Sequence, residues 1–213
     1  MKKVILLTSF LVFSLYCFTQ NSSVTYTKYT LVGTGQISIP STLELQAGDY
    51  KKKAENLHKA VGNEISGDRV VFQLKGFNDG LYPNTPSYER IMFYTIKGAY
   101  GQFKKLTSKN IATKQELIDI EKKDYQEQIN SPIPIKMLSY DGASIVFING
   151  QPAIKTACLR QIEGNEPCYI EIYHFQNNDR VHRLSISYRK SQAHIWKPIF
   201  EQVLNSFTIT NIR

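Results

Sequence analysis

Four turn signals divide the last third of the chain into short segments. They are Asp141-Gly142, Asn149-Gly150, the stretch 163–167 and the stretch 177–179. Asn-Gly and Asp-Gly dipeptides readily adopt the backbone conformations of tight hairpins, and clusters of Asn, Asp, Gly and Pro interrupt strands. The sequence therefore predicts a meander of five antiparallel strands, at residues 135–140, 143–148, 151–161, 168–177 and 180–189.

Amphipathic periodicity predicts three helices that would cover such a sheet. The first is expected at residues 50–61, with Asp49 as its N-cap. The second follows the capping-box pair Thr113 and Glu116 and ends near residue 129. The residues of this second helix that we expect to face inward are Leu117, Ile118, Tyr125 and Ile129.

The third helix, expected at residues 192–206, has the longest apolar stripe in the chain. Its members recur at helical spacing, and they are Trp196, Ile199, Phe200, Val203, Leu204 and Phe207. A stripe of this length requires a large apolar surface to bury against. We therefore expect this helix to pack on the sheet.

Shorter extended segments are expected before the meander, at residues 34–39, 43–46, 69–75 and 89–97. In the segment 89–97 both alternating sets of side chains are fairly apolar, which is typical of a central strand covered on both faces. We therefore expect an α+β fold, an α/β/α sandwich with three helices around a central, mainly antiparallel sheet that includes the five-strand meander.

The order of these elements resembles that of the PsbP-like α/β/α sandwich superfamily. The segments that are similar to the family pattern are Ile37-Ser38-Ile39-Pro40, Asn149-Gly150-Gln151-Pro152-Ala153 and the last helix with its end at Phe207. The resemblance covers nearly all of the chain after residue 19, although Leu43 stands where such proteins often have an aromatic residue. This superfamily includes the extrinsic protein of photosystem II, a Ran-binding nuclear-transport factor and small bacterial envelope proteins. The resemblance implies a non-enzymatic binding or assembly role and supplies no catalytic residues.

The first nineteen residues have the features of a secretory signal peptide. A pair of lysines provides a positive start, and residues 4–18 form an apolar run. This run is shorter than the roughly 20 apolar residues that a membrane-spanning helix needs. Cys17 and Thr19 provide the small residues that signal peptidase requires before Gln20. We therefore predict cleavage between Thr19 and Gln20 and a periplasmic or extracellular protein without a transmembrane segment.

Two other interpretations of the N-terminus remain. The apolar run could stay as an uncleaved membrane anchor, or Cys17 could carry a lipid, although the bulky Tyr16 precedes this cysteine where lipidation favours a small residue. After cleavage we expect residues 20–30 to form a flexible lead-in and residues 31–213 to form a single PsbP-like domain. A chain of about 190 residues is long enough to bury a core of its own.

The mature chain is basic. Its formal net charge of +8 falls to +6 when Lys2 and Lys3 leave with the signal peptide. A positive protein outside the cytoplasm can bind anionic surfaces such as lipid headgroups or polysaccharide, whereas contact with nucleic acid is not expected there. The lysines are scattered along the sequence, so the charge also has a simple explanation in solubility.

Two cysteines, Cys158 and Cys168, remain after removal of the signal peptide. An even number of cysteines in an oxidising compartment favours a disulfide, and the turn signal between these two would place them on neighbouring strands. A bridge over a loop of this size would stabilise the fold by about 2–3 kcal/mol. We therefore predict a disulfide between Cys158 and Cys168.

His174 and His182 flank the last turn and are the candidate metal ligands. If residues 174 and 182 pair directly, the two side chains share a face of the sheet and could bind a metal together with a third donor. If the turn has two central residues, Phe175 opposes His182 instead, and the two histidines lie on opposite faces. We expect the tighter turn, and therefore neither a metal nor another cofactor.

The connection 98–110 combines aromatic residues with positive charge. The residues concerned are Tyr100, Phe103, Lys104, Lys105 and Lys109. Such a mixture suits stacking on sugars or contact with an anionic surface. It is also compatible with an ordinary surface loop that tucks in one or two aromatic rings. We regard this loop as the candidate contact surface for an envelope protein or an anionic polysaccharide.

The sequence contains none of the common catalytic signatures. There is no nucleophile elbow, no zinc-protease motif, no P-loop and no dinucleotide-binding motif. We therefore expect a secreted or periplasmic binding or accessory module that acts through surface contacts and has no catalytic residues. The alternatives are a hydrolase with an unfamiliar site and a carrier of a small apolar ligand.

The signal peptide gives the first testable prediction. When the full chain is expressed in a bacterium with an export pathway, we expect the mature protein to begin at Gln20. Intact-mass spectrometry and N-terminal sequencing of the envelope fraction measure this directly. As a control, replacing Thr19 with a bulky residue should block cleavage. A mature protein that retains Met1 would contradict the prediction.

Overall fold

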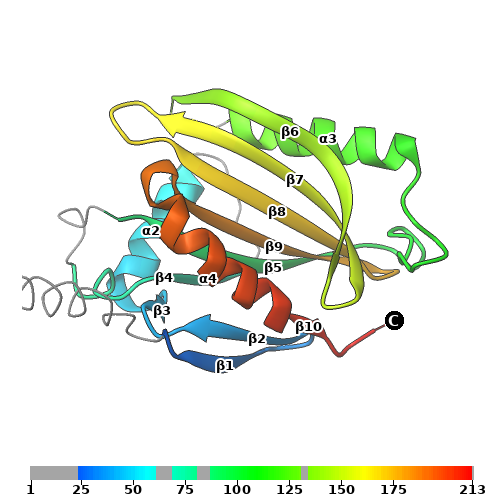
Figure 1. The fold of residues 1–213 in the computed structure, drawn as a ribbon, viewed down its shortest axis with the longest axis horizontal. Coiled ribbons are helices and arrows are strands. Elements are labelled where there is room, and N and C mark those ends of the chain that lie inside the picture. The colour runs from blue at the N-terminus through cyan, green and yellow to red at the C-terminus, as the bar shows by residue number, and fades with distance from the viewer. Residues whose placement is uncertain (1–23, 61–68, 81–86, 131–133, 213) are drawn as a thin grey trace, which may run out of the picture.

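A seven-stranded sheet forms the centre of the molecule (Figure 1). The computed structural model describes residues 24–60, 69–80, 87–130 and 134–212. The strand order is β3-β4-β5-β9-β8-β7-β6, and every neighbouring pair is antiparallel. The strands are β3 (Leu43–Leu45), β4 (Val70–Leu74), β5 (Glu89–Lys97), β6 (Ile135–Ile148), β7 (Gln151–Ile162), β8 (Cys168–Gln176) and β9 (Arg180–Arg189).

A second, smaller sheet lies beside the first. Its order is β1-β2-β10, with β1 at Tyr26–Leu31, β2 at Gly35–Pro40 and β10 at Thr208–Ile209. β2 pairs with both of its neighbours in antiparallel fashion. A side chain at Gly35 would meet the Thr208 backbone oxygen at 1.7 Å, so this residue must be glycine for β10 to approach.

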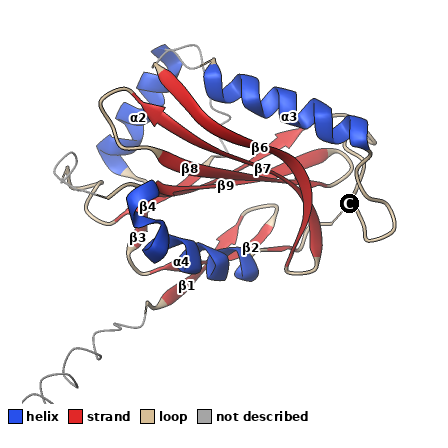
Figure 2. Cartoon of the chain, turned by 45° about the horizontal axis from the view of Figure 1, so that its top comes forward, coloured by secondary structure: helices blue, strands red, loops and turns tan. Residues whose placement is uncertain are grey.

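Helices lie on both faces of the main sheet (Figure 2). α4 (Ala193–Ser206), which follows a short 3₁₀ turn at Lys190–Gln192, lies on one face together with the small sheet. α2 (Gly48–Ala60) and α3 (Lys114–Ile129) lie on the other face. This arrangement confirms the predicted α/β/α sandwich and, in the described part of the chain, its three α-helices.

The hydrophobic core lies between α4, the small sheet and the main sheet. The predicted stripe of α4 is confirmed, because Trp196, Phe200, Val203 and Leu204 are all buried. They pack against the side chains that β9 directs to this face, Leu184, Ile186 and Tyr188. Complete burial of one such side chain stabilises the fold by about 1.5–3 kcal/mol, so this face holds the sandwich together.

The meander has four strands and not the predicted five. Residues 135–148 form one continuous strand, β6, and the expected turn at Asp141-Gly142 is an irregularity within it. The pairing with β7 shifts between Tyr140 and Ala143, and Gly142 has a φ of 73°. A β-bulge uses the same residue types as a hairpin turn, which explains the wrong prediction. The other three turn signals do join consecutive strands.

The start of the domain also differs from the prediction. Residues 26–30, expected to be flexible, belong to β1 and pair with β2. The signal peptide and its cleavage site lie outside the described residues. In the four described ranges, no helix has the length and apolar character to span a membrane.

His182 joins the two sheets. Its Nδ1 atom lies 2.9 Å from the hydroxyl of Thr95 in β5 and 3.3 Å from that of Thr34 in the β1–β2 turn. Its Nε2 atom lies 3.3 Å from the side-chain amide nitrogen (Nδ2) of Asn177. The ring is completely buried. Burial, together with the charge of Arg180, lowers the pKa of His182 to about 4, so the ring is neutral in the folded protein.

The neutral ring predicts a loss of stability in acid. Because the folded state resists protonation, the unfolded state binds the extra proton between pH 6.5 and about 4. The contribution of the neutral ring to the free energy of unfolding should be fully present above pH 6.5. It should be lost as the pH falls through this window, and the total loss is about 1.4 kcal/mol for each unit by which the two pKa values differ. Urea unfolding at pH 7.5 and pH 5 measures the change.

Two variants isolate this effect from other titrating groups. His182→Gln keeps hydrogen-bonding capacity but cannot titrate, so its unfolding free energy should depend less on pH than that of the unmodified protein. His194→Gln, at an exposed position of α4, should retain the full dependence. Equal pH dependence in all three proteins would contradict the assignment.

Candidate functional site

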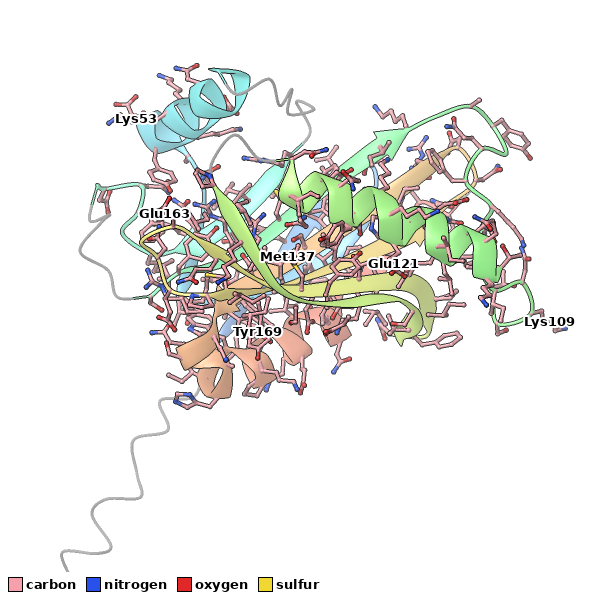
Figure 3. The ribbon with its side chains drawn as sticks, turned by 90° about the horizontal axis from the view of Figure 1, so that it is seen from above. Lys53, Lys109, Glu121, Met137, Glu163 and Tyr169 are labelled. Atoms are coloured by element: carbon pink, nitrogen blue, oxygen red, sulfur yellow. The ribbon has the colours of Figure 1, made fainter. Side chains whose placement is uncertain are left out.

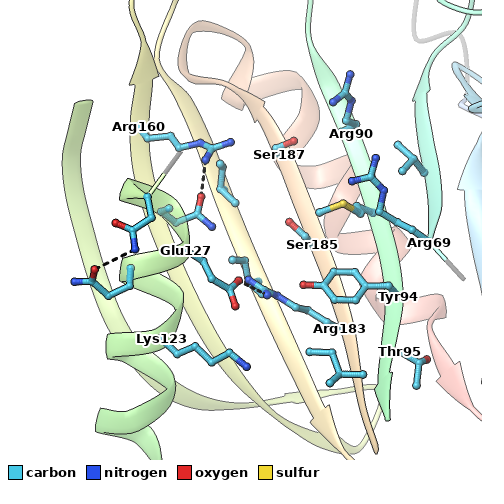
Figure 4. A pocket seen from close by; sticks show the side chains of 18 of the residues that line it. Arg69, Arg90, Tyr94, Thr95, Lys123, Glu127, Arg160, Arg183, Ser185 and Ser187 are labelled. Carbon is cyan, nitrogen blue, oxygen red and sulfur yellow. Dashed lines mark hydrogen bonds and ion pairs between the residues drawn. The ribbon is translucent and has the colours of Figure 1, made fainter. Parts of the chain in front are cut away.

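The face of the main sheet opposite α4 carries a groove. β9 directs Arg183, Ser185 and Ser187 to this face, alternating with the large apolar residues that it directs to the core. Two small serine side chains on a central strand leave a hollow that larger residues would fill. The cavity has a volume of about 790 Å³. We call it the α3 groove, because α3 forms one of its walls (Figure 4).

The floor and walls of the α3 groove come from six elements. The floor consists of Ile170 and Ile172 from β8, the two serines of β9, and Met92 and Tyr94 from β5. One wall is formed by α3, through Lys123, Gln126, Glu127 and Gln128, together with Arg160 of β7. The opposite wall is formed by Arg69, beside β4, and by Arg90 and Tyr88 near the start of β5.

The position of α3 depends on polar contacts. The residues of α3 that are buried are Asp124 and Gln128, whereas the apolar residues expected inward are only half-buried. Asp124 Oδ2 accepts a hydrogen bond from the Thr156 hydroxyl at 2.5 Å and lies 2.8 Å from His174 Nε2. Gln128 accepts a hydrogen bond from Arg160 at 2.7 Å. The helix is therefore fixed in register against β7, β8 and β9.

Arg183 completes this buried ionic cluster. Its guanidinium lies 3.3 Å from Asp124 and 2.5 Å from Glu127, and only 5% of its side chain is exposed. Burial alone would raise the pKa of Asp124, but the hydrogen bond and charge of His174 and the charge of Arg183 hold this pKa below its usual value. The carboxylate therefore stays charged and pairs with Arg183 beneath the helix.

Positive charge predominates in the α3 groove. Arg183 is neutralised by Asp124 and Glu127, whereas Arg69, Arg90, Arg160 and Lys123 also line the groove. Within the described ranges, no salt bridge joins Arg69, Arg160 or Lys123 to a carboxylate, whereas Arg90 donates a hydrogen bond to the Tyr50 hydroxyl at 3.1 Å. Burial and the charge of Arg90 lower the pKa of Arg69, whereas the charge of Glu55 acts in the opposite direction.

Both serine hydroxyls on the floor are available to a ligand. Neither Ser185 nor Ser187 forms a side-chain hydrogen bond with any residue in the described part of the chain. Neither hydroxyl oxygen is shut off from the groove, so both can be reached from it. A hydroxyl can donate or accept a hydrogen bond. The α3 groove thus offers hydroxyls at its floor and cations at its walls.

The lining has binding groups but no catalytic set. No histidine or cysteine is among the described residues that line the groove, and its carboxylate, Glu127, is paired with Arg183. Both serines therefore lack the neighbouring base that a nucleophile needs. Cys158 lies nearby on the same face, but burial raises the pKa of its thiol to about 11, which makes it unreactive.

The predicted disulfide is not formed. Both cysteines are free thiols, and the residue opposite Cys158 is Ile170, whereas the residue opposite Cys168 is Arg160. The two cysteines are thus diagonal neighbours on one face. Diagonal side chains in a sheet are about 7 Å apart, whereas a disulfide needs a Cβ separation of about 4 Å. The turn between β7 and β8 is present as predicted, but the strand register leaves the two cysteines two residues apart.

The two candidate metal ligands are separated by the sheet. Phe175 is the partner of His182, and Arg183 is the partner of His174, as expected for the tighter turn. His174 faces α3, and His182 faces the small sheet. The two rings therefore cannot share a metal ion.

The candidate contact loop lies away from the α3 groove. None of Tyr100, Phe103, Lys104, Lys105 and Lys109 is among the groove residues. The loop is held at the far end of the molecule by the β8–β9 turn, where Asn178 accepts a hydrogen bond from the Phe103 backbone at 2.9 Å. Figure 3 shows Lys109 at the opposite end from Glu163. Tyr100 is 88% exposed and remains available for contact.

Sequence reasoning missed the residues of the α3 groove. Arg69, Arg160 and Arg183 come from separate segments and have no common motif. A weak signal was present in β9, where large apolar residues alternate with Arg183, Ser185 and Ser187. This alternation indicates two faces of different chemistry. It does not reveal that arginines of other strands reach the same face.

The fold is similar to that of a solved PsbP structure. Cyanobacterial PsbP (CyanoP) from Synechocystis superposes with a TM-score of 0.51 and 13% identity, covering 89% of this chain and 95% of that one. A crystal structure from Bacteroides thetaiotaomicron has a TM-score of 0.46 and 12% identity, and the match covers 87% of this chain and 48% of that one. The Ran-binding protein Mog1p from Saccharomyces cerevisiae has a TM-score of 0.44 and 14% identity, and the match covers 89% of this chain and 97% of that one. Neither a family model nor a curated protein matches the sequence. The CyanoP comparison supports the PsbP-like fold, and at this identity it bears on the fold alone.

The buried cluster beneath α3 makes a stability prediction. Asp124→Asn keeps the size of the side chain but leaves the guanidinium of Arg183 without its buried counter-charge. We expect the free energy of unfolding to fall by about 3 kcal/mol. Glu127→Gln removes a carboxylate from the same arginine, but this side chain is 39% exposed, and the loss should stay below about 1 kcal/mol. Urea unfolding compares the two variants, and equal losses would contradict the assignment.

Proposed function

We propose that this chain is an exported, non-enzymatic binding or accessory protein and that the α3 groove is its binding surface. The observation that carries the proposal is the composition of the groove. Its lining has five cationic side chains, one of which is paired with Asp124 and Glu127, and the hydroxyls of two floor serines, but no paired nucleophile and base. Such a surface can hold a partner or ligand, and it cannot activate water or a side chain for attack.

The proposed location depends on the N-terminal sequence. A positive start, an apolar run and small residues before Gln20 are the pattern of a cleaved export signal. Candidate partners are therefore envelope proteins and the anionic polysaccharides or lipid headgroups of a cell surface. The positive charge of the groove favours a partner that presents negative charge.

A hydrolase receives little support from the described residues. His174 and Asp124 are the residue types of a catalytic dyad and lie within hydrogen-bonding distance of each other. Both are buried beneath α3, however, and neither lines the groove. Burial raises the pKa of Glu89 to about 7, a value suited to acid–base catalysis. This carboxyl is completely buried on the α4 side of the sheet, where no substrate reaches it.

A carrier of a purely apolar ligand also fits poorly. Such a ligand favours an enclosed apolar cavity. The space between α3 and the sheet is an open groove whose walls hold four cationic side chains. An apolar ligand would have to remove water from these charges without replacing it, which is unfavourable.

Site-specific photocrosslinking in cells tests the proposed binding surface. A photoreactive residue at Gln126, an exposed position on the groove wall, should form adducts with a specific envelope component. The same residue at Lys28, an exposed position of β1 on the other side of the molecule, is the matched control and should form none. Adducts should become weaker in the double variant Arg69→Gln, Arg160→Gln. Identical adducts from both positions, or adducts with cytoplasmic proteins alone, would contradict the proposal.

A further inference from the structure

We propose that the ligand of the α3 groove is an organic anion with an apolar body, such as an alkyl phosphate or alkyl carboxylate. This inference rests on the proposed binding function and adds the chemical class of the ligand. Three features of the groove support it: the charges of its walls, the composition of its floor and its size.

The charges of the walls require a negative group. Arg69 and Arg90 lie on one wall, and Arg160 and Lys123 lie on the other. The single carboxylate of the lining, Glu127, is already occupied by Arg183 at 2.5 Å. An anion bound between the walls would be attracted by cationic side chains on both sides of it. Guanidinium groups are also well suited to carboxylate and phosphate, which they bind through two hydrogen bonds.

The floor changes from polar to apolar across neighbouring strands. In one row, Arg90 of β5 pairs with Ser187 of β9, which pairs with Ile170 of β8. In the next row, Ser185 lies between Met92 and Ile172. A ligand lying along the first row would therefore meet a cation, a hydroxyl and an aliphatic side chain in succession, and the second row would add apolar contacts on both sides of its serine. This order matches a molecule with an acidic head and a hydrocarbon body.

The size of the groove fits a small molecule. A volume of about 790 Å³ lies within the range of about 300–1,000 Å³ that is usual for small-molecule sites. Inorganic phosphate alone would occupy a small part of it and would leave the aliphatic floor in contact with water. An uncharged hydrocarbon would offer no negative charge to Arg69, Arg160 and Lys123. Both halves of the ligand are needed to match the lining.

Calorimetric titration with four probes tests this class. The purified protein is titrated with octyl phosphate, octanoate, octanol and inorganic phosphate. We expect both octyl anions to bind at least tenfold more tightly than octanol and than inorganic phosphate. Equal binding of octanol would overturn the requirement for charge, and equal binding of inorganic phosphate would overturn the requirement for an apolar body.

Two sets of variants place the binding in the α3 groove. Arg69→Gln with Arg160→Gln should weaken octyl phosphate binding roughly tenfold or more, because charge-assisted hydrogen bonds are lost. Ser187→Leu keeps every charge but fills the floor, and it should abolish binding. Ser187→Ala leaves the space open and should bind nearly as well as the unmodified protein. Thermal unfolding of each variant shows whether it is folded.

A matched double variant controls for net charge. Lys104→Gln with Lys109→Gln removes two positive charges from the exposed loop at the end of the molecule. Binding of octyl phosphate should be unchanged in this variant. Loss of binding here, with retention in the groove variants, would overturn the proposal and would support the loop as the anion site.

A final comparison identifies the source of the anion. Flotation with vesicles that contain phosphatidylglycerol should recover the protein if the natural ligand is a membrane lipid, and the groove variants should then fail to float. If octyl phosphate binds but vesicles do not, the ligand is a free amphiphile. If no probe binds, but crosslinks from Gln126 still form in cells, the ligand class is wrong while the binding role stands.

Discussion

Strand β9 determines the architecture because its two faces carry different chemistry. On one face Leu184, Ile186 and Tyr188 bury apolar surface beneath α4 and the small sheet, and this burial stabilises the packing of these layers. On the other face the alternate positions hold Arg183 and two serines, which cannot form a hydrophobic core. The same ten-residue strand therefore specifies both the core of the domain and the hollow that a ligand can enter.

The polar face determines how α3 is held. A helix on an apolar surface can slide or rotate with little change in energy, whereas a carboxylate that must meet a particular hydroxyl, imidazole and guanidinium has one position. Asp124 makes these contacts with Thr156, His174 and Arg183. Buried ion pairs contribute little net stability compared with apolar packing, so their effect here is on the placement of the helix. The width of the groove follows from this placement.

Local signals in the sequence were sufficient for most of the framework. The capping box of Thr113 and Glu116 and the apolar stripe of α4 depend on neighbours within a few residues, and both are present in the structure. The bulge at Gly142 was mistaken for a turn because the same backbone conformation serves both. The offset of the two cysteines depends on strand register, which composition does not define to the nearest residue.

The groove itself was beyond sequence reasoning. Its arginines have no distinctive neighbours in the sequence, and only long-range strand pairing places them around two serines. The helix face was wrongly predicted for a related reason. Asp124 and Gln128 have the residue types of a solvated surface, and their burial depends on partners supplied by β7, β8 and β9. Residues whose role depends on distant partners carry no local signature.

The last strand of the sheet has one further consequence. β6 is fourteen residues long and has a neighbour on one side only, so its free edge would ordinarily be a template for another copy of the chain. Its register breaks after Met137 and again after Tyr140, and the backbone amide of Ala143 donates to the carboxylate of Glu121. No long uninterrupted ladder is therefore presented to solvent. The irregularity that replaces the expected turn is thus of the kind that disfavours pairing between the edges of two sheets.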